Sequence, residues 1–129
     1  MGPEILRDIS FEIEPQSFQF LTGPSGAGKT TLLRLMLLAL KPTRGFINLF
    51  GRMSNDLLPG EITRLRRRIG VVFQDFRLLD HLTTYENVAL PLVYAGIPKK
   101  IRNEMAEEVL RKVDLADRSH HKPNEMSGG

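Results

Sequence analysis

The chain has 129 residues, of which 41% are hydrophobic and 26% charged, and its formal net charge is +3. This length and composition predict one soluble globular domain with its own core, and they exclude a disordered or fibrous protein. The absence of cysteine excludes disulfides, thiol catalysis and zinc–thiolate sites. The most apolar stretch, residues 32–40, is far shorter than the roughly 20 residues that span a bilayer. The mild basic excess favours a solvated basic face over nucleic-acid binding.

The first half of the chain is predicted to be rich in strands. Alternating apolar residues predict a half-buried strand at 9–13, and a second strand at 18–21 leads into a glycine-rich loop. Residues 29–40 are helix formers with almost no polar face, which predicts a buried helix. The expected elements that follow are a strand at 46–50, a loop at 51–60, a short polar helix at 61–68 and a buried strand at 69–73.

The second half of the chain is predicted to be helical. Thr83 and Thr84 can cap a helix, although Pro91 is expected to kink or interrupt it. Residues 98–113 carry apolar residues at steps of four, which predicts an amphipathic helix with these residues on its apolar face: Ile101, Met105, Val109 and Val113.

Residues 23–30 match the phosphate-binding pattern G-x-x-x-x-G-K-[ST]. The glycines let successive backbone N–H groups converge on phosphate oxygens, and the following helix adds its positive end. Lys29 supplies a positive charge for the β- and γ-phosphates, and the Thr30 hydroxyl suits magnesium. The pattern therefore predicts a site for a nucleoside triphosphate with magnesium. The expected contacts are Gly23, Pro24, Ser25, Gly26, Ala27, Gly28, Lys29, Thr30 and Thr31.

Two further segments narrow the interpretation. Gln74 ends the predicted strand at 69–73, and residues 126–129 read Met-Ser-Gly-Gly. Together with the loop at 23–30, they resemble the Walker A, Q-loop and signature motifs of ATP-binding-cassette (ABC) ATPases. The resemblance implies an α/β P-loop NTPase fold with a mixed β-sheet core. It also implies a β-rich portion at about 1–75, a helical subdomain at about 76–125 and the start of the signature motif at 126–129.

The resemblance also implies cofactors and roles. ATP and Mg²⁺ are the implied cofactors, Lys29 and Gln74 the implied catalytic residues, and Thr30 and Gln74 the implied magnesium ligands. The signature residues would contact ATP held by a second subunit: Ser127, Gly128 and Gly129. A homodimer around nucleotide and an integral membrane partner are implied as well. That partner would place the protein at the cytoplasmic face of the cell membrane.

Within the family, residues 35–45, 65–75 and 76–92 resemble the cell-division ATP-binding protein FtsE, which implies an FtsX-like membrane partner. Lipoprotein- and drug-export ATPases share much of this pattern and are the alternative. The chain lacks the family's Walker B glutamate, D-loop, switch histidine and adenine-stacking aromatic residue. We therefore expect an ATPase as the longer parent, negligible hydrolysis by these 129 residues and exposed apolar sheet surface. A non-hydrolysing nucleotide-binding module is the second alternative.

Overall fold

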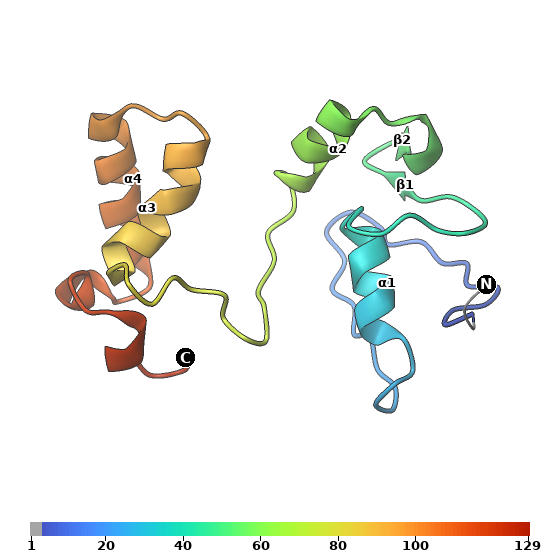
Figure 1. Cartoon of the computed structure of the whole chain (residues 1–129), viewed down its shortest axis with the longest axis horizontal. Coiled ribbons are helices and arrows are strands. Elements are labelled where there is room, and N and C mark those ends of the chain that lie inside the picture. Colours follow the sequence, from blue (N-terminus) through green and yellow to red (C-terminus); the bar gives the residue numbers. More distant parts are fainter. Residues whose placement is uncertain (1–3) are drawn as a thin grey trace. The chain divides into compact units, whose positions relative to one another are not determined.

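The computed structural model describes residues 4–129 and divides into two compact units, one ending at Val71 and one spanning Val72–Gly129 (Figure 1). The first unit contains α1 (Lys29–Met36), β1 (Asn48–Leu49), β2 (Arg52–Met53), a 3₁₀ helix (Ser54–Asp56) and α2 (Pro59–Arg66). The second contains α3 (Thr84–Tyr94), α4 (Lys99–Lys112) and 3₁₀ helices at Ala116–Arg118 and Pro123–Glu125. Within residues 4–129, no helix is long and apolar enough to cross a membrane.

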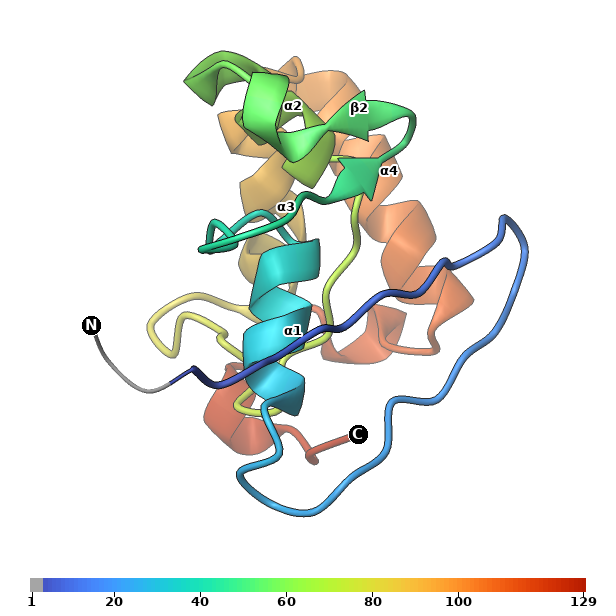
Figure 2. The ribbon, with the colours of Figure 1, turned by 90° about the vertical axis from the view of Figure 1, so that its right-hand side faces the viewer.

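The strands β1 and β2 form a short antiparallel hairpin, with Asn48 opposite Met53 and Leu49 opposite Arg52 (Figure 2). The two turn residues, Phe50 and Gly51, have φ values of 52° and 78°. Left-handed backbone at both positions is what a two-residue type I′ turn requires. The predicted strand at 46–50 is thus confirmed in its central residues. The predicted loop that follows contains the second strand and a 3₁₀ helix.

The strands predicted at 9–13, 18–21 and 69–73 are wrong for this structure. Within residues 4–129, the only strand ladder is the β1–β2 hairpin, so the mixed sheet is reduced to two strands. Phe18 and Phe20 are each 83% exposed, and Val72 is fully exposed. Extended backbone becomes a strand only when a neighbouring strand accepts and donates its hydrogen bonds, and no described segment does so here. Apolar surface is exposed, as expected from the sequence, but on extended segments outside the sheet.

Helix α1 begins at Lys29, as predicted, but ends at Met36 rather than at residue 40. Leu38 has a φ of 54°, its N–H donates to the Leu35 carbonyl at 2.9 Å, and the Ala39 N–H donates to the Arg34 carbonyl at 2.8 Å. These two bonds form a Schellman motif, which closes a helix. The prediction that the helix is buried is also wrong, because no large sheet in this unit covers its apolar side chains and none of them is buried.

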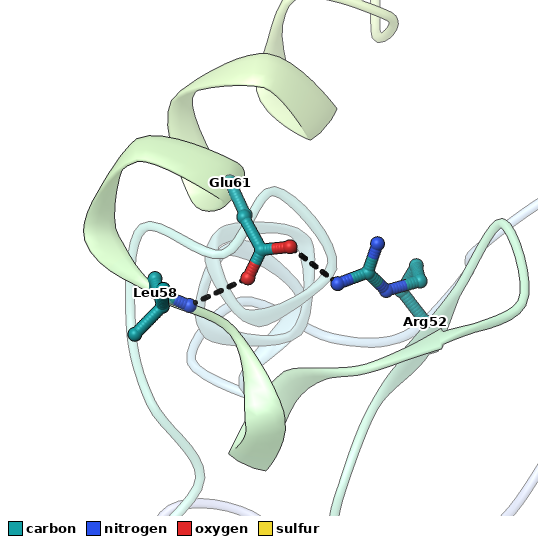
Figure 3. Close-up of polar contacts among 3 residues, drawn as sticks. All are labelled: Arg52, Leu58 and Glu61. Carbon is teal, nitrogen blue, oxygen red and sulfur yellow. Dashed lines mark hydrogen bonds and ion pairs between the residues drawn. The ribbon is translucent and has the colours of Figure 1, made fainter.

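Helix α2 begins at Pro59, two residues before the predicted start, because proline is well suited to the first helical position. The carboxylate of Glu61 accepts the Leu58 N–H at 3.0 Å and pairs with the Arg52 guanidinium (Figure 3). The hydrogen bond from the Leu58 N–H and the contact with Arg52 lower the pKa of Glu61. This pairing ties the start of α2 to β2, while Leu65 on the same helix is buried.

Helix α3 begins with the predicted threonine cap. The Thr83 hydroxyl oxygen accepts the Glu86 N–H at 3.2 Å, and the Glu86 carboxylate accepts the Thr83 N–H at 2.7 Å. This reciprocal pair is a capping box. Pro91 lies inside the helix, which runs on to Tyr94, so the predicted interruption does not occur. The Asn87 side chain also binds the preceding loop. Its Oδ1 accepts the Leu79 N–H, and its Nδ2 donates to the Leu79 carbonyl.

Helix α4 (Lys99–Lys112) confirms the helix predicted at 98–113 to within one residue at each end. The face of the helix that is buried differs from the predicted apolar face. Ala106 and Leu110 are the buried residues of α4, at 0% and 1% exposure, and α4 packs against α3. The predicted apolar face is between 42% and 56% exposed: Ile101, Met105, Val109 and Val113. A single neighbouring helix covers only one face, and small residues such as alanine favour the close approach of two helices.

Candidate functional site

The loop that precedes α1 curls through two left-handed glycines. Gly26 has a φ of 77° and Gly28 a φ of 93°, and the Ala27 N–H donates to the Pro24 carbonyl at 3.2 Å. Residues with a Cβ are strained when φ is positive, so glycine is favoured at both positions. The sequence pattern predicted that glycines let the backbone curl here, and two of the three glycines of the loop have left-handed backbone.

Gly28 also permits a close contact that the sequence did not reveal. A Cβ at this position would lie 2.6 Å from Leu6 Cδ2 and 3.3 Å from Ile5 Cγ2. The N-terminal segment therefore packs directly against the backbone where α1 begins. No pattern in the sequence identified the loop as the neighbour of this segment.

The Lys29 side chain folds back over the loop. Its ammonium group donates to the Gly23 carbonyl at 2.6 Å and to the Pro24 carbonyl at 2.8 Å. A lysine ammonium has three donors, so these two bonds hold the loop and leave a third for a ligand. The charge is thus held over the same loop whose glycines shape the backbone, and this arrangement suits an anion.

The first turn of α1 completes the donor set. Gly28 is the N-cap residue and provides no side-chain cap, and the Leu32 N–H is the one that donates to the Gly28 carbonyl. The N–H groups of Lys29, Thr30 and Thr31 come earlier in this turn, where backbone N–H groups have no hydrogen-bond acceptor within the helix. No acidic residue lies in this turn. The Thr30 side chain is exposed, which leaves its hydroxyl available to a hard cation.

These groups fit a phosphate chain with magnesium. Backbone N–H groups, one ammonium and the positive end of α1 are donors for phosphate oxygens. The Thr30 hydroxyl is an oxygen ligand of the kind that Mg²⁺ takes alongside phosphates. Within residues 4–129, no cluster of three or more His, Cys, Asp or Glu residues forms a metal site independent of a ligand.

The other predicted site residues belong to the second unit. Gln74 lies in an exposed turn with Asp75, and the φ values of the next two residues, Phe76 and Arg77, are 56° and 52°. Ser127, Gly128 and Gly129 are exposed and lie outside any helix. The structure therefore describes the phosphate loop in one unit, and Gln74 with the terminal Ser-Gly-Gly in the other.

The family model described as ABC transporter matches residues 6–129. The chain belongs to the ABC transporter family. An uncharacterized ABC transporter ATP-binding protein of Thermotoga maritima is 43% identical over 98% of the chain and 54% of that protein. The ABC transporter ATP-binding protein YknY of Bacillus subtilis is 42% identical over 98% of the chain and 55% of that protein. The chain therefore spans about half the length of these relatives.

A more distant relative and a solved structure agree. The macrolide export ATP-binding/permease protein MacB of Salmonella typhimurium is 40% identical over 97% of the chain and 19% of that protein. A dimeric structure of the ATP-binding cassette MJ0796, bound to ADP and Pi, is 40% identical with a TM-score of 0.69. It covers 81% of this chain and 47% of that one. The fold is therefore that of the ABC class of P-loop NTPases, and the predicted family is confirmed.

Proposed function

We propose that this chain is part of the ATP-binding subunit of an ABC-type complex and that its longer parent hydrolyses ATP. The observation that carries this proposal is the Lys29 ammonium, held by the carbonyls of Gly23 and Pro24 in a loop whose Gly26 and Gly28 have left-handed backbone. This is a pre-organised cradle for phosphate, and pre-organised donors stabilise the charge of a transferring phosphoryl group at little cost in reorganisation.

In the proposed mechanism, the residues of the loop bind and orient the nucleotide. Loop N–H groups hold the phosphates, Lys29 neutralises charge on the β- and γ-phosphates, and the Thr30 hydroxyl holds magnesium. Bound Mg²⁺ supplies further neutralisation of the phosphate charge. From the family resemblance, we assign Gln74 to magnesium and the attacking water. Ser127, Gly128 and Gly129 are assigned to the ATP of a second copy, in line with the dimeric structure of the MJ0796 cassette.

The process served by the parent has two candidates. The export role is supported by the 40% identity to the macrolide export protein MacB. The cell-division role rests on the FtsE-like segments at 35–45, 65–75 and 76–92. In both cases the ATPase acts through an integral membrane subunit. Purification of the parent with a four-span membrane protein encoded beside division genes would favour division, and purification with an export permease would favour transport.

Isothermal titration with MgATP tests the binding proposal. We expect saturable binding to the 129-residue chain, reduced about ten- to a hundredfold by Lys29→Ala, because a charged hydrogen-bond partner contributes about 1.5–3 kcal/mol. Lys41→Ala is the matched control, since Lys41 is an exposed lysine of the same unit outside the loop. Equal affinities for both variants would contradict the proposal.

Hydrolysis is tested separately. We expect phosphate release by the native-length parent, lost in its Lys29→Ala variant, and negligible release by the 129-residue chain. Binding without turnover in the parent would instead support a non-hydrolysing nucleotide-binding module.

A further inference from the structure

The turn that carries Gln74 adopts an unusual backbone. Phe76 and Arg77 are consecutive non-glycine residues with φ values of 56° and 52°. The Arg77 N–H donates to the Asp75 carbonyl at 2.6 Å, and the Phe76 N–H donates to the Phe73 carbonyl at 3.3 Å. A three-residue turn whose central residue has positive φ is rare and strained. Such strain persists only where surrounding contacts over-determine it.

The Arg77 side chain makes two contacts across this turn. Its guanidinium carbon lies 4.1 Å from the centroid of the Phe73 ring, and its Nε lies 3.4 Å from Asp75 Oδ1. The arginine therefore folds back over the turn and binds both an aromatic face and a carboxylate. Cation–π and ionic contacts of this kind oppose opening of the turn.

The strained turn presents the Phe76 ring to the signature segment. A Cβ at Gly128 would lie 3.5 Å from Phe76 Cζ, so the tip of the ring is in van der Waals reach of this glycine. Within residues 4–129, no backbone hydrogen bond involves Ser127, Gly128 or Gly129. The last backbone bond before them is that of the Met126 N–H to the Pro123 carbonyl at 3.1 Å. The Phe76 ring therefore contacts a segment that no described backbone hydrogen bond holds.

We propose that Phe76 is a positioning residue for Ser127–Gly128–Gly129, and that the Arg77-clamped turn following Gln74 sets where its ring lies. A change of conformation at Gln74 would then be transmitted to the signature segment through one side chain. The functional meaning of this coupling rests on the proposed function, since it links two motifs assigned to nucleotide. The physical contact itself does not require nucleotide.

NMR of the nucleotide-free 129-residue chain, labelled with ¹⁵N-glycine and ¹³C-phenylalanine, tests the contact. We expect a nuclear Overhauser effect between the Phe76 ring and the Gly128 α protons, and a ring-current shift of the Gly128 signals. Phe76→Leu should abolish both, and Phe76→Tyr should retain both because the ring is kept. Phe46→Leu is the matched control, since Phe46 and Phe76 are 63% and 60% exposed. Absence of the effect in the unsubstituted chain would overturn the proposal.

The clamp is tested by variants that leave Phe76 in place. Arg77→Ala and Phe73→Leu each remove the stacked pair, and we expect each to weaken the Phe76–Gly128 effect and to move the Gly128 signal towards its position in Phe76→Leu. The signals of Ala106 and Leu110, the buried pair of α4, report whether the unit remains folded in each variant. An unchanged Gly128 signal in either folded variant would overturn the clamp. Failure of the chain to bind MgATP, measured separately, would contradict the proposed function but would not affect the conclusion about the Phe76–Gly128 contact.

Discussion

Replacing Gly28 by alanine should damage both the stability of the first unit and its affinity for nucleotide. The residue has a φ of 93°, and a Cβ there would lie 2.6 Å from Leu6 Cδ2. An L-residue in left-handed backbone costs on the order of 1–2 kcal/mol. Moving the Leu6 side chain off its preferred rotamer adds roughly 1 kcal/mol. We therefore expect a loss of about 2–3 kcal/mol in the free energy of unfolding.

Substitutions at two other glycines distinguish the effect of backbone strain from that of the steric clash and from that of a position in the phosphate loop. Gly26 and Gly45 have φ values of 77° and 83°, and a Cβ at either would meet no atom within 4 Å. Alanine at each should therefore cost only the backbone strain, on the order of 1–2 kcal/mol. Gly26 lies in the phosphate loop, whereas Gly45 follows α1 at some distance along the chain. Gly45→Ala is the control for strain without loss of the site.

Urea unfolding followed by far-ultraviolet circular dichroism gives the stabilities, and titration with a fluorescent ATP analogue gives the affinities. In Gly26→Ala and Gly28→Ala, opening the loop would relieve the backbone strain but would misplace the N–H donors. If closing the loop again costs about 1.4 kcal/mol, the affinity for ATP falls about tenfold, so we expect a loss of about tenfold or more. Gly45→Ala should bind normally. Gly28→Ala that binds ATP as tightly as Gly45→Ala, with the same stability, would refute the reasoning.

Three further substitutions, with one control, test the packing, the cap and the ion pair. Leu110→Ala should lower the free energy of unfolding of the second unit by about 2–5 kcal/mol, because a fully buried leucine leaves a cavity. The half-exposed Val109→Ala in the same helix should cost clearly less in the same urea titration. Thr83→Ala should cost about 0.5–2 kcal/mol through loss of the cap, and an unchanged unfolding midpoint would contradict the capping box. The lowered pKa of Glu61 stabilises the fold above the carboxyl's ordinary value of 4.5, and this contribution is lost as the pH falls through the folded-state pKa. Arg52→Ala should move that pKa back towards 4.5 in a ¹³C-carboxyl NMR titration, and an unmoved value would exclude the pair as a cause.

The sequence predicted those structural features that depend on interactions between residues close together in the chain. The loop at 23–30, the start of α1, the Thr83 cap and the extent of α4 follow from backbone preferences and hydrogen bonds within a few residues. The phosphate loop is an example, because the left-handed backbone of Gly26 and Gly28 and the bonds from Lys29 to the loop carbonyls all lie within a few residues.

Features that depend on distant partners were not predictable. The apolar runs at 18–21 and 69–73 carry strand propensity, but no described segment pairs with them. Periodicity identified α4 as amphipathic and then placed Val109 inside, whereas its neighbour Leu110 is buried because α3 packs against that side. The contact between Phe76 and Gly128 joins residues 52 positions apart in numbering, and no pattern in the sequence connects them.

The central claim is that residues 23–30 bind the phosphates of a nucleotide. Titration of the ¹⁵N-glycine-labelled chain with MgATP tests it most directly, because glycines of like backbone conformation lie inside and outside the loop. The account predicts saturable shifts of the Gly26 and Gly28 signals, with Gly45 and Gly51 unmoved and the response absent in Lys29→Ala. Small uniform shifts of all four signals, or an undiminished response in Lys29→Ala, would contradict it.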